Sequence, residues 1–270
     1  MTRLLLGSLL LCACATHPVR VGTSAHGDLR LDTEKVARMR YAGLSRTAAT
    51  TTATSTVPLA VGSTLVIATP VVLAILQSQD KAGELQERLL ECARLAERQV
   101  NFPLFGNRPP TREECGEELV VDGCPEPITR AMLLGRQKHD IALACASDVL
   151  KQLWPRPFSI EQRYRYYPNT RFLETVSRAE EQRLIDIRCT RELWRTIKPD
   201  IVLHGDYNLL QAVLILDFKF PCPPTNPATW KWYGETSAYP NSIQGEVYTK
   251  ALGGEAMIIS PQGIFPGVLR

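Results

Sequence analysis

The sequence lacks several patterns that assign a chain to a familiar class. Its eight cysteines include no pair of C-x-x-C motifs, which argues against a zinc-knuckle fold. No segment repeats, which argues against a solenoid or a propeller. The net charge of the 270 residues is only +3 and 44% of them are hydrophobic, so the chain is not disordered throughout. The composition is that of a globular protein with one sizeable core plus additional segments.

The mild positive charge is unevenly distributed. Residues 127–270 contain 18 Lys/Arg against 14 Asp/Glu, whereas residues 1–126 contain 13 against 14. Within the basic half, residues 156–198 combine ten basic side chains with aromatic ones. The aromatic residues are Tyr164, Tyr166, Tyr167, Phe172 and Trp194. Cations that contact phosphates and aromatics that stack on bases suit a nucleic-acid channel. A solvated helix face with ordinary core aromatics is the alternative.

The N-terminus is specific. A positive start at Arg3, an apolar run over residues 4–11 and the motif Leu11-Cys12-Ala13-Cys14 resemble a bacterial lipoprotein signal peptide. Cleavage after residues 1–13 would leave Cys14 as a first residue modified by lipid, such as palmitate. Cys12 is a poorer candidate because Leu11 is large for the position before the cleavage site. We therefore expect a lipid-anchored protein of the bacterial cell envelope.

Two different segments follow the signal. Residues 14–56 end in a stretch rich in Thr and Ala and are predicted to form a flexible tether. Residues 57–76 are then free of charge but contain Gly62 and Pro70. Their length suffices to span a bilayer. A buried helical hairpin is an equally open interpretation.

Residues 77–126 are predicted to be a helix followed by a linker. An amphipathic helix is expected over residues 80–100, and five prolines between residues 101 and 127 indicate a linker before the core. The inward stripe of that helix is Leu85, Leu89, Cys92, Leu95 and Ala96.

Export from the cytoplasm would allow the cysteines to form disulfides. With Cys12 removed and Cys14 acylated, six remain, an even number in a compartment that permits disulfides. Cys115 and Cys124 flank a short Gly-containing segment and are candidates to close a small loop.

The most informative motif lies in the C-terminal half. The apolar run 212–216 predicts a strand buried on both faces, which ends in Asp217-Phe218-Lys219. Side chains two apart on a strand share a face, so Asp217 and Lys219 emerge together while Phe218 turns inward. Asp200 opens the preceding strand, residues 201–204, and the turn residues 205–208 join the two strands as a hairpin. Two neighbouring carboxylates usually need a shared hard cation such as Mg²⁺.

A structural Asp–Lys pair at a strand end is the alternative, and the downstream sequence bears on the choice. Gln244 and Tyr248 open a predicted helix and share one of its faces, and an apolar strand over residues 256–259 follows. The order PD, D-x-K, Q-x-x-x-Y, set on strand, strand, helix and strand, resembles the PD-(D/E)xK nuclease superfamily, in particular its RecB-like branch. The resemblance covers roughly residues 127–262.

The resemblance implies a Mg²⁺- or Mn²⁺-dependent phosphodiesterase that hydrolyses DNA or RNA. Asp200 and Asp217 match the metal-binding acids, Phe218 would lend its backbone carbonyl to the metal, and Lys219 matches the catalytic lysine. Gln244 and Tyr248 match the helix pair that supports the site and touches nucleic acid.

Such nucleases usually have an acidic residue on a helix before the first core strand. The pattern Gly135-x-x-x-His139-Asp140 matches the RecB-like helix, which makes His139 and Asp140 candidates, with Glu174 as a rival. A surface His-Asp pair is the alternative.

The expected fold is an α/β, restriction-endonuclease-like core over residues 127–270, with a mixed central sheet flanked by helices. We predict helices over residues 128–153 and 243–252. Strands are predicted near residues 184–188, 201–204, 213–220 and 256–259. The strand at residue 213 should be central because it is apolar on both faces.

A nuclease tethered to its own envelope has no nucleic acid to cut there. Anchor, apolar segment and C-terminal nuclease together resemble bacterial polymorphic toxins, more narrowly the lipoprotein toxins passed between related cells by outer-membrane exchange. This resemblance implies a cognate immunity protein, membrane contact through the lipid and residues 57–76, and delivery into a neighbouring cell's cytoplasm. A non-catalytic envelope lipoprotein whose C-terminal domain binds a partner, and a scavenger of extracellular DNA, are the alternatives.

Overall fold

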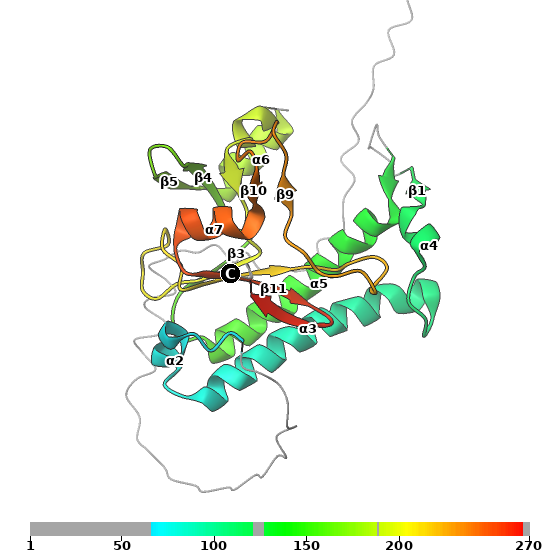
Figure 1. Cartoon of the computed structure of the whole chain (residues 1–270), viewed down its shortest axis with the longest axis horizontal. Helices are drawn as coiled ribbons and strands as arrows, with labels where there is room; N and C mark the ends of the chain where they lie inside the picture. Colours follow the sequence, from blue (N-terminus) through cyan, green and yellow to red (C-terminus); the bar gives the residue numbers. More distant parts are fainter. Residues whose placement is uncertain (1–65, 121–126, 188, 267–270) are drawn as a thin grey trace, which may run out of the picture. The chain divides into compact units, whose positions relative to one another are not determined.

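A computed structural model describes residues 66–120, 127–187 and 189–266, which form a mixed α/β structure with several sheets (Figure 1). The helices are α2 (Pro70–Leu76), α3 (Gln79–Phe105), α4 (Arg112–Gly116), α5 (Arg130–Leu153), α6 (Arg178–Asp186), α7 (Gln244–Leu252) and the 3-10 helix η1 (Thr190–Leu193). The strands are β1 (Glu118–Leu119), β2 (Ile128–Thr129), β3 (Phe158–Ile160), β4 (Arg163–Tyr167), β5 (Phe172–Val176), β6 (Thr196–Ile197), β7 (Ile201–Leu203), β8 (Leu214–Phe218), β9 (Trp232–Tyr233), β10 (Ser242–Ile243), β11 (Glu255–Ser260) and β12 (Gly263–Pro266).

The principal sheet has five strands in the order β12-β11-β8-β7-β3. The strand β8 pairs antiparallel with β7 and parallel with β11, so the sheet is mixed. Every residue of β8 is buried, as expected for an uninterrupted apolar strand covered on both faces. The predicted central position of this strand and the predicted β7–β8 hairpin are confirmed.

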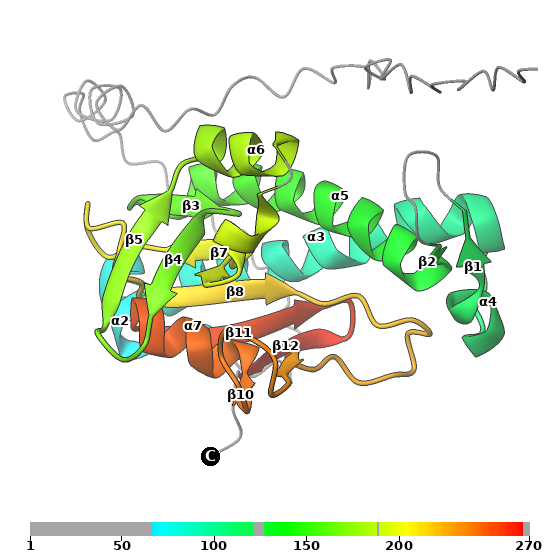
Figure 2. The ribbon, with the colours of Figure 1, turned by 90° about the horizontal axis from the view of Figure 1, so that it is seen from above.

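Helices cover both faces of this sheet (Figure 2). Leu214, Leu216 and Phe218 pack into one core with residues of α3 and α5. Ile215 packs into a second core, on the opposite face, with residues of α7. Because side chains alternate along a strand, Asp217 and Lys219 share the α7 face with Ile215.

The long helix α3 belongs to the same core as the sheet. Ser78 caps its N-terminus by accepting hydrogen bonds from the N–H groups of Asp80 and Lys81. Its buried stripe includes Leu85, Leu89, Cys92 and Ala96 of the predicted inward set, whereas Leu95 is half-buried. A disulfide joins Cys92 to Cys145 of α5. Residues 77–126, expected to be a helix and a linker ahead of the nuclease-like region, therefore include a helix that completes the core of that region.

The apolar segment is described only from residue 66 onward, and residues 57–65 lie outside the described part. Ile67, Val72 and Leu76 are buried in the core beside α3, and the Thr69 hydroxyl caps α2. In the part of the chain that the structure describes, no helix is both long and apolar enough to cross a membrane. The predicted signal peptide, Cys14 and the tether of residues 14–56 also lie outside the described residues.

The strand predicted near residues 184–188 is wrong, because α6 (Arg178–Asp186) occupies most of this stretch. The Ser177 hydroxyl accepts a hydrogen bond from the N–H of Glu180, and Glu180 and Glu181 stand in the first turn. A serine followed three residues later by glutamate is a helix-start signal. The apolar Leu184 and Ile185 obscured that signal because a short apolar run fits either period.

The predicted disulfide is also corrected. Cys115 pairs with Cys222, 107 residues away, and not with Cys124, which lies outside the described residues. Cys189 is a free, exposed thiol. The tertiary fold brings α4 beside the Pro-rich loop that follows β8, a proximity that cysteine spacing does not reveal.

Candidate active site

Two acids meet at the open end of the β7–β8 hairpin. Asp200 immediately precedes β7, and Asp217 is the fourth residue of β8. Both are buried, with Asp200 9% and Asp217 3% exposed. The N–H of Phe218 donates a 2.7 Å hydrogen bond to Oδ2 of Asp200. The residue before Asp200 is Pro199, which has no N–H group to donate a further hydrogen bond between β7 and β8. The Asp200 carboxylate therefore holds the two strands together at this end.

Lys219 lies beside Asp217, as strand alternation predicts. Its ammonium forms an ion pair with Oδ2 of Asp217. The same Nζ donates to Oε1 of Gln244 at 2.9 Å and lies 5.6 Å from the ring centroid of Trp230. The lysine is thus held in one position by three neighbours, with a quarter of its side chain exposed.

Gln244 and Tyr248 continue this chain of contacts on α7. The Nε2 group of Gln244 donates to the Tyr248 hydroxyl at 2.7 Å, as expected for residues one helical turn apart. The Tyr248 hydroxyl donates in turn to the backbone carbonyl of Lys198 at 3.3 Å. With Tyr248 taking the amide N–H, the amide oxygen of Gln244 must face Lys219. The sequence-predicted pair therefore orients the lysine.

Of the three candidates for the additional ligand, His139, Asp140 and Glu174, only His139 reaches the two acids. Its Nδ1 lies 3.1 Å from Oδ2 of Asp200, and its ring packs edge-on against Phe220. Asp140 is exposed on α5. Glu174 forms an ion pair with Arg165 on the second sheet, β5-β4-β6. His139 stands at the site, and Asp140 and Glu174 stand apart from it.

The electrostatics of the site follow from burying like charges together. Burial raises the pKa of Asp217 from 3.8 to about 6, the negative charge of Asp200 adds to this, and Lys219 opposes it. Burial lowers the pKa of His139, but the hydrogen bond and charge of Asp200 outweigh it, so the net shift is upward. Burial, followed by the charge of Asp217, raises the pKa of Tyr248 well above its usual value. The candidate active site therefore has too little positive charge to balance its two buried carboxylates.

Asp200 and Asp217 suit a small hard cation whose remaining ligands are water and substrate oxygens. Within the described residues, no group of three or more His, Cys, Asp or Glu side chains is arranged to hold a metal ion by itself. Mg²⁺ is usually bound through one or two carboxylates, with water and substrate phosphates completing its shell. Asp200 and Asp217 supply two carboxylates. Because N–H and C=O of one strand residue point to the same edge, the Phe218 carbonyl faces the Asp200 side as its N–H does.

Two aromatic residues at the site were missed from the sequence. Trp230 contacts Lys219 and meets Tyr248 edge-on at 5.9 Å between ring centroids. Burial and the charge of Asp217 raise the pKa of Tyr233 to about 12. The cluster Trp230-Lys231-Trp232-Tyr233, just after the Pro-rich loop, was the available signal.

The basic and aromatic segment of residues 156–198 divides into core and surface. Tyr164 and Tyr166 are buried in the second core. Phe172 and Trp194 are about half-exposed, and the Arg195 guanidinium lies 5.2 Å from the Trp194 ring centroid. The interpretation as ordinary core aromatics therefore holds for Tyr164 and Tyr166, whereas Phe172 and Trp194 lie on the surface.

Comparison with protein families, with curated proteins and with solved structures finds no match to this chain.

Proposed function

We propose that this protein is a metal-dependent nuclease that hydrolyses phosphodiester bonds of DNA or RNA. The observation that carries the proposal is the convergence of Asp200, Asp217 and Lys219 on one sheet face, with Gln244 of α7 holding the lysine. These residues come from three parts of the chain: the start of β7, the end of β8 and the first turn of α7. A structural ion pair requires only Asp217 and Lys219.

The arrangement of the elements supports a restriction-endonuclease-like core. The central strand β8 carries the D-x-K motif, the antiparallel β7 follows Asp200, and α7 links β9–β10 to the parallel β11. The helix α5, before these strands, brings His139 to Asp200 from the opposite sheet face.

The chemistry divides among the residues as follows. Hydrolysis adds the oxygen of water to phosphorus, breaks one P–O ester bond and gives a proton to the leaving oxygen. Asp200, Asp217 and the Phe218 carbonyl would hold Mg²⁺ or Mn²⁺, which supplies an activated water and a counter-charge. Lys219 stabilises charge that grows on the phosphoryl oxygens in the transition state. Gln244 and Tyr248 keep Lys219 in place, and His139 orients Asp200.

The biological setting is proposed from the sequence. A lipobox at Cys14, an apolar segment and a C-terminal nuclease suit a lipoprotein toxin transferred between cells, with a cognate immunity protein in the producer. The described disulfides, Cys92–Cys145 and Cys115–Cys222, suit an oxidising compartment such as the periplasm.

The test of the nuclease uses the full chain, purified with its disulfides intact, on labelled DNA and RNA. Cleavage should be absent in chelator and return with Mg²⁺ or Mn²⁺. Asp217→Asn, nearly isosteric, should remove activity, and Lys219→Ala should retain metal binding but lose most turnover. Asp140→Ala, exposed on α5, is the matched control and should cleave normally. Full activity of Asp217→Asn in chelator would leave only a strand-end ion pair and favour the non-catalytic, partner-binding lipoprotein.

The lipid anchor has its own test. Cys14→Ala should abolish labelling by radioactive palmitate and leave unprocessed precursor, while nuclease activity of the purified chain is unchanged. Normal membrane attachment of that variant would transfer the anchoring role to residues 57–76.

A further inference from the structure

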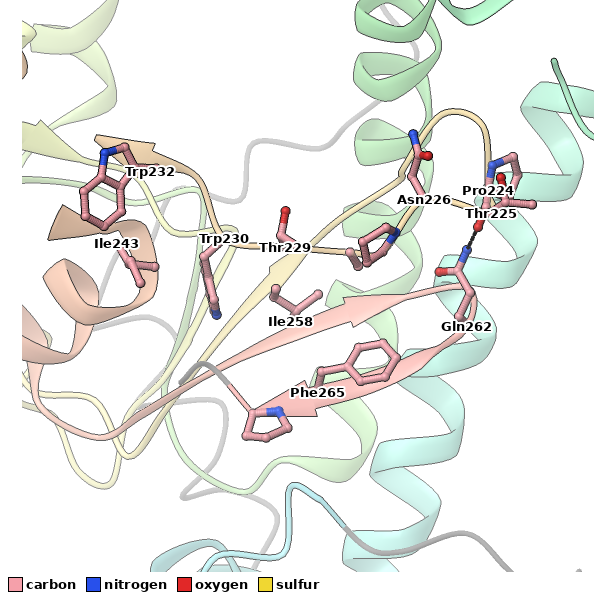
Figure 3. A pocket seen from close by; sticks show the side chains of 13 residues that line it. Pro224, Thr225, Asn226, Thr229, Trp230, Trp232, Ile243, Ile258, Gln262 and Phe265 are labelled. Atoms are coloured by element: carbon pink, nitrogen blue, oxygen red, sulfur yellow. Dashed lines mark hydrogen bonds between the residues drawn. The ribbon is translucent and has the colours of Figure 1, made fainter. Parts of the chain in front are cut away.

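A mostly apolar pocket of about 660 Å³ lies near Trp230, which contacts Lys219 of the candidate active site. Figure 3 shows the side chains that line this pocket. Its walls are the Pro-rich loop of residues 224–229, the strand β9 and the β11–β12 hairpin. Two aromatic side chains on these walls are open to solvent, Trp232 at 58% and Phe265 at 41% exposed. Large apolar side chains left exposed around a concave surface mark a binding site more often than a surface without function.

The pocket adjoins the candidate active site through two of its lining residues. Ile258 lines it and stands opposite Asp217 in the parallel register of β11 and β8, so the two side chains share a sheet face. Trp230 also lines the pocket, and the ammonium group of Lys219 lies 5.6 Å from the centroid of the Trp230 ring. A ligand that fills the pocket therefore lies next to whatever Asp217 and Lys219 hold.

Contacts from distant parts of the chain hold the pocket open. The Nε2 group of Gln262, in the β11–β12 turn, donates to the carbonyl of Pro224 at 2.8 Å (Figure 3). The disulfide from Cys115 to Cys222 anchors the start of the same loop. A pocket formed before the ligand arrives binds at lower entropic cost.

Trp230 fits because α7 has a glycine at its second residue. A Cβ atom added to Gly245 would lie 2.7 Å from the ring of Trp230, closer than real contacts allow. The glycine therefore lets the indole lie against the helix, between Tyr248 and Lys219.

We propose that this pocket receives one nucleobase of a single-stranded nucleic acid, adjacent to the phosphodiester held at Lys219. The inference rests on the proposed nuclease function. A nucleobase presents flat π-faces that stack on indole and phenyl rings with little dependence on sequence. It reaches the pocket only when unpaired, since a base inside a duplex is stacked and covered. The pocket thus selects single strands, DNA or RNA, over duplex.

The test is a cleavage ladder on an end-labelled homopolymer that carries one abasic residue, run with the full chain and Mg²⁺. In the wild-type protein, cleavage should fall about tenfold at one bond at a fixed offset from the abasic residue, since stacking of one base contributes on the order of 1–3 kcal/mol. In Trp232→Ala the overall cleavage rate should fall, and the weak band at that offset, the gap in the ladder, should disappear. Parallel DNA and RNA ladders identify the substrate.

The matched control is Tyr207→Ala. Tyr207 is 65% exposed and lies in the turn between β7 and β8, at the end of that hairpin away from Asp200 and Asp217. It should keep the wild-type gap. An even ladder from an active wild-type enzyme would overturn the base pocket while the nuclease stands. No cleavage of any nucleic acid would overturn both. If Trp232→Ala leaves the ladder unchanged but alters the sedimentation of the chain, the pocket receives a second copy and the proposal fails.

Discussion

Oδ2 of Asp200 accepts a 2.7 Å hydrogen bond from the N–H of Phe218, 18 residues away. The same oxygen lies 3.1 Å from Nδ1 of His139. Asp200 therefore joins β7, β8 and α5 as well as offering a carboxylate to the site. Replacing it would combine a loss of structure with a loss of chemistry, so Asp217 and His139 are the more informative positions for mutation.

We predict that His139→Ala lowers nuclease activity by about tenfold or more while the fold survives, since partners that orient a metal-binding residue typically contribute 10–100-fold. Asp140→Ala and Glu174→Ala should retain wild-type rates because neither side chain reaches the acids. Rates on labelled DNA and RNA, with circular dichroism to verify folding, check this. Equal loss in Asp140→Ala would mean that α5 is being disturbed as a whole.

Asp217→Asn should stabilise the metal-free protein in a pH-dependent way. The folded-state pKa of Asp217, about 6, exceeds the ordinary 3.8, so its contribution to stability is full below 3.8 and is lost as pH rises to 6. Asparagine does not titrate, so the variant escapes this loss. In chelator the Tm of the variant should exceed that of wild type at pH 8 by about 5 °C, and the difference should vanish near pH 4. A constant difference at all pH values would contradict the raised pKa.

Lys138 is buried on α5, 1% exposed, and its Nζ pairs with Oε2 of Glu97 on α3 at 2.9 Å. Lys138→Met should lower the free energy of unfolding by about 3 kcal/mol, because it leaves the Glu97 charge without its partner. The double variant Lys138→Met/Glu97→Leu should recover most of that loss. Lys151→Met is the control, because its exposed pair with Asp148 should contribute under about 0.5 kcal/mol.

Urea denaturation in chelator compares the wild type with Lys138→Met, Glu97→Leu, their double variant and the control Lys151→Met. Additive losses in the double variant would show that the two charges do not interact.

A fragment of residues 127–270 should fail to fold, whereas residues 66–270 should fold. The shorter fragment lacks α3, whose Leu85, Leu89 and Ala96 are fully buried against the sheet and α5. Its absence exposes the apolar side chains of the sheet and α5 that α3 covers, which costs about 2 kcal/mol for each large side chain. Proteolysis and heteronuclear NMR of the two fragments check this. A dispersed spectrum from the shorter fragment would make α3 an accessory helix.

Several features were predictable from the residues because their causes are local. The alternation of Asp217, Phe218 and Lys219 on a buried strand, and the shared helix face of Gln244 and Tyr248, follow from backbone periodicity. The helix of α5 and the central place of β8 follow from apolar pattern and length.

Other features depended on the tertiary structure because they join residues far apart in the chain. His139 and Asp140 are neighbours on α5, but only His139 faces Asp200. The rotation of the helix about its axis in the packed core decides which of the two does so. The partner of Cys115 and the place of α3 in the core are long-range contacts with no local signal. Trp230 reaches Lys219 because Gly245 leaves room for its ring. The sequence by itself determined which side chains the proposed chemistry would use, and packing alone decided which of them meet.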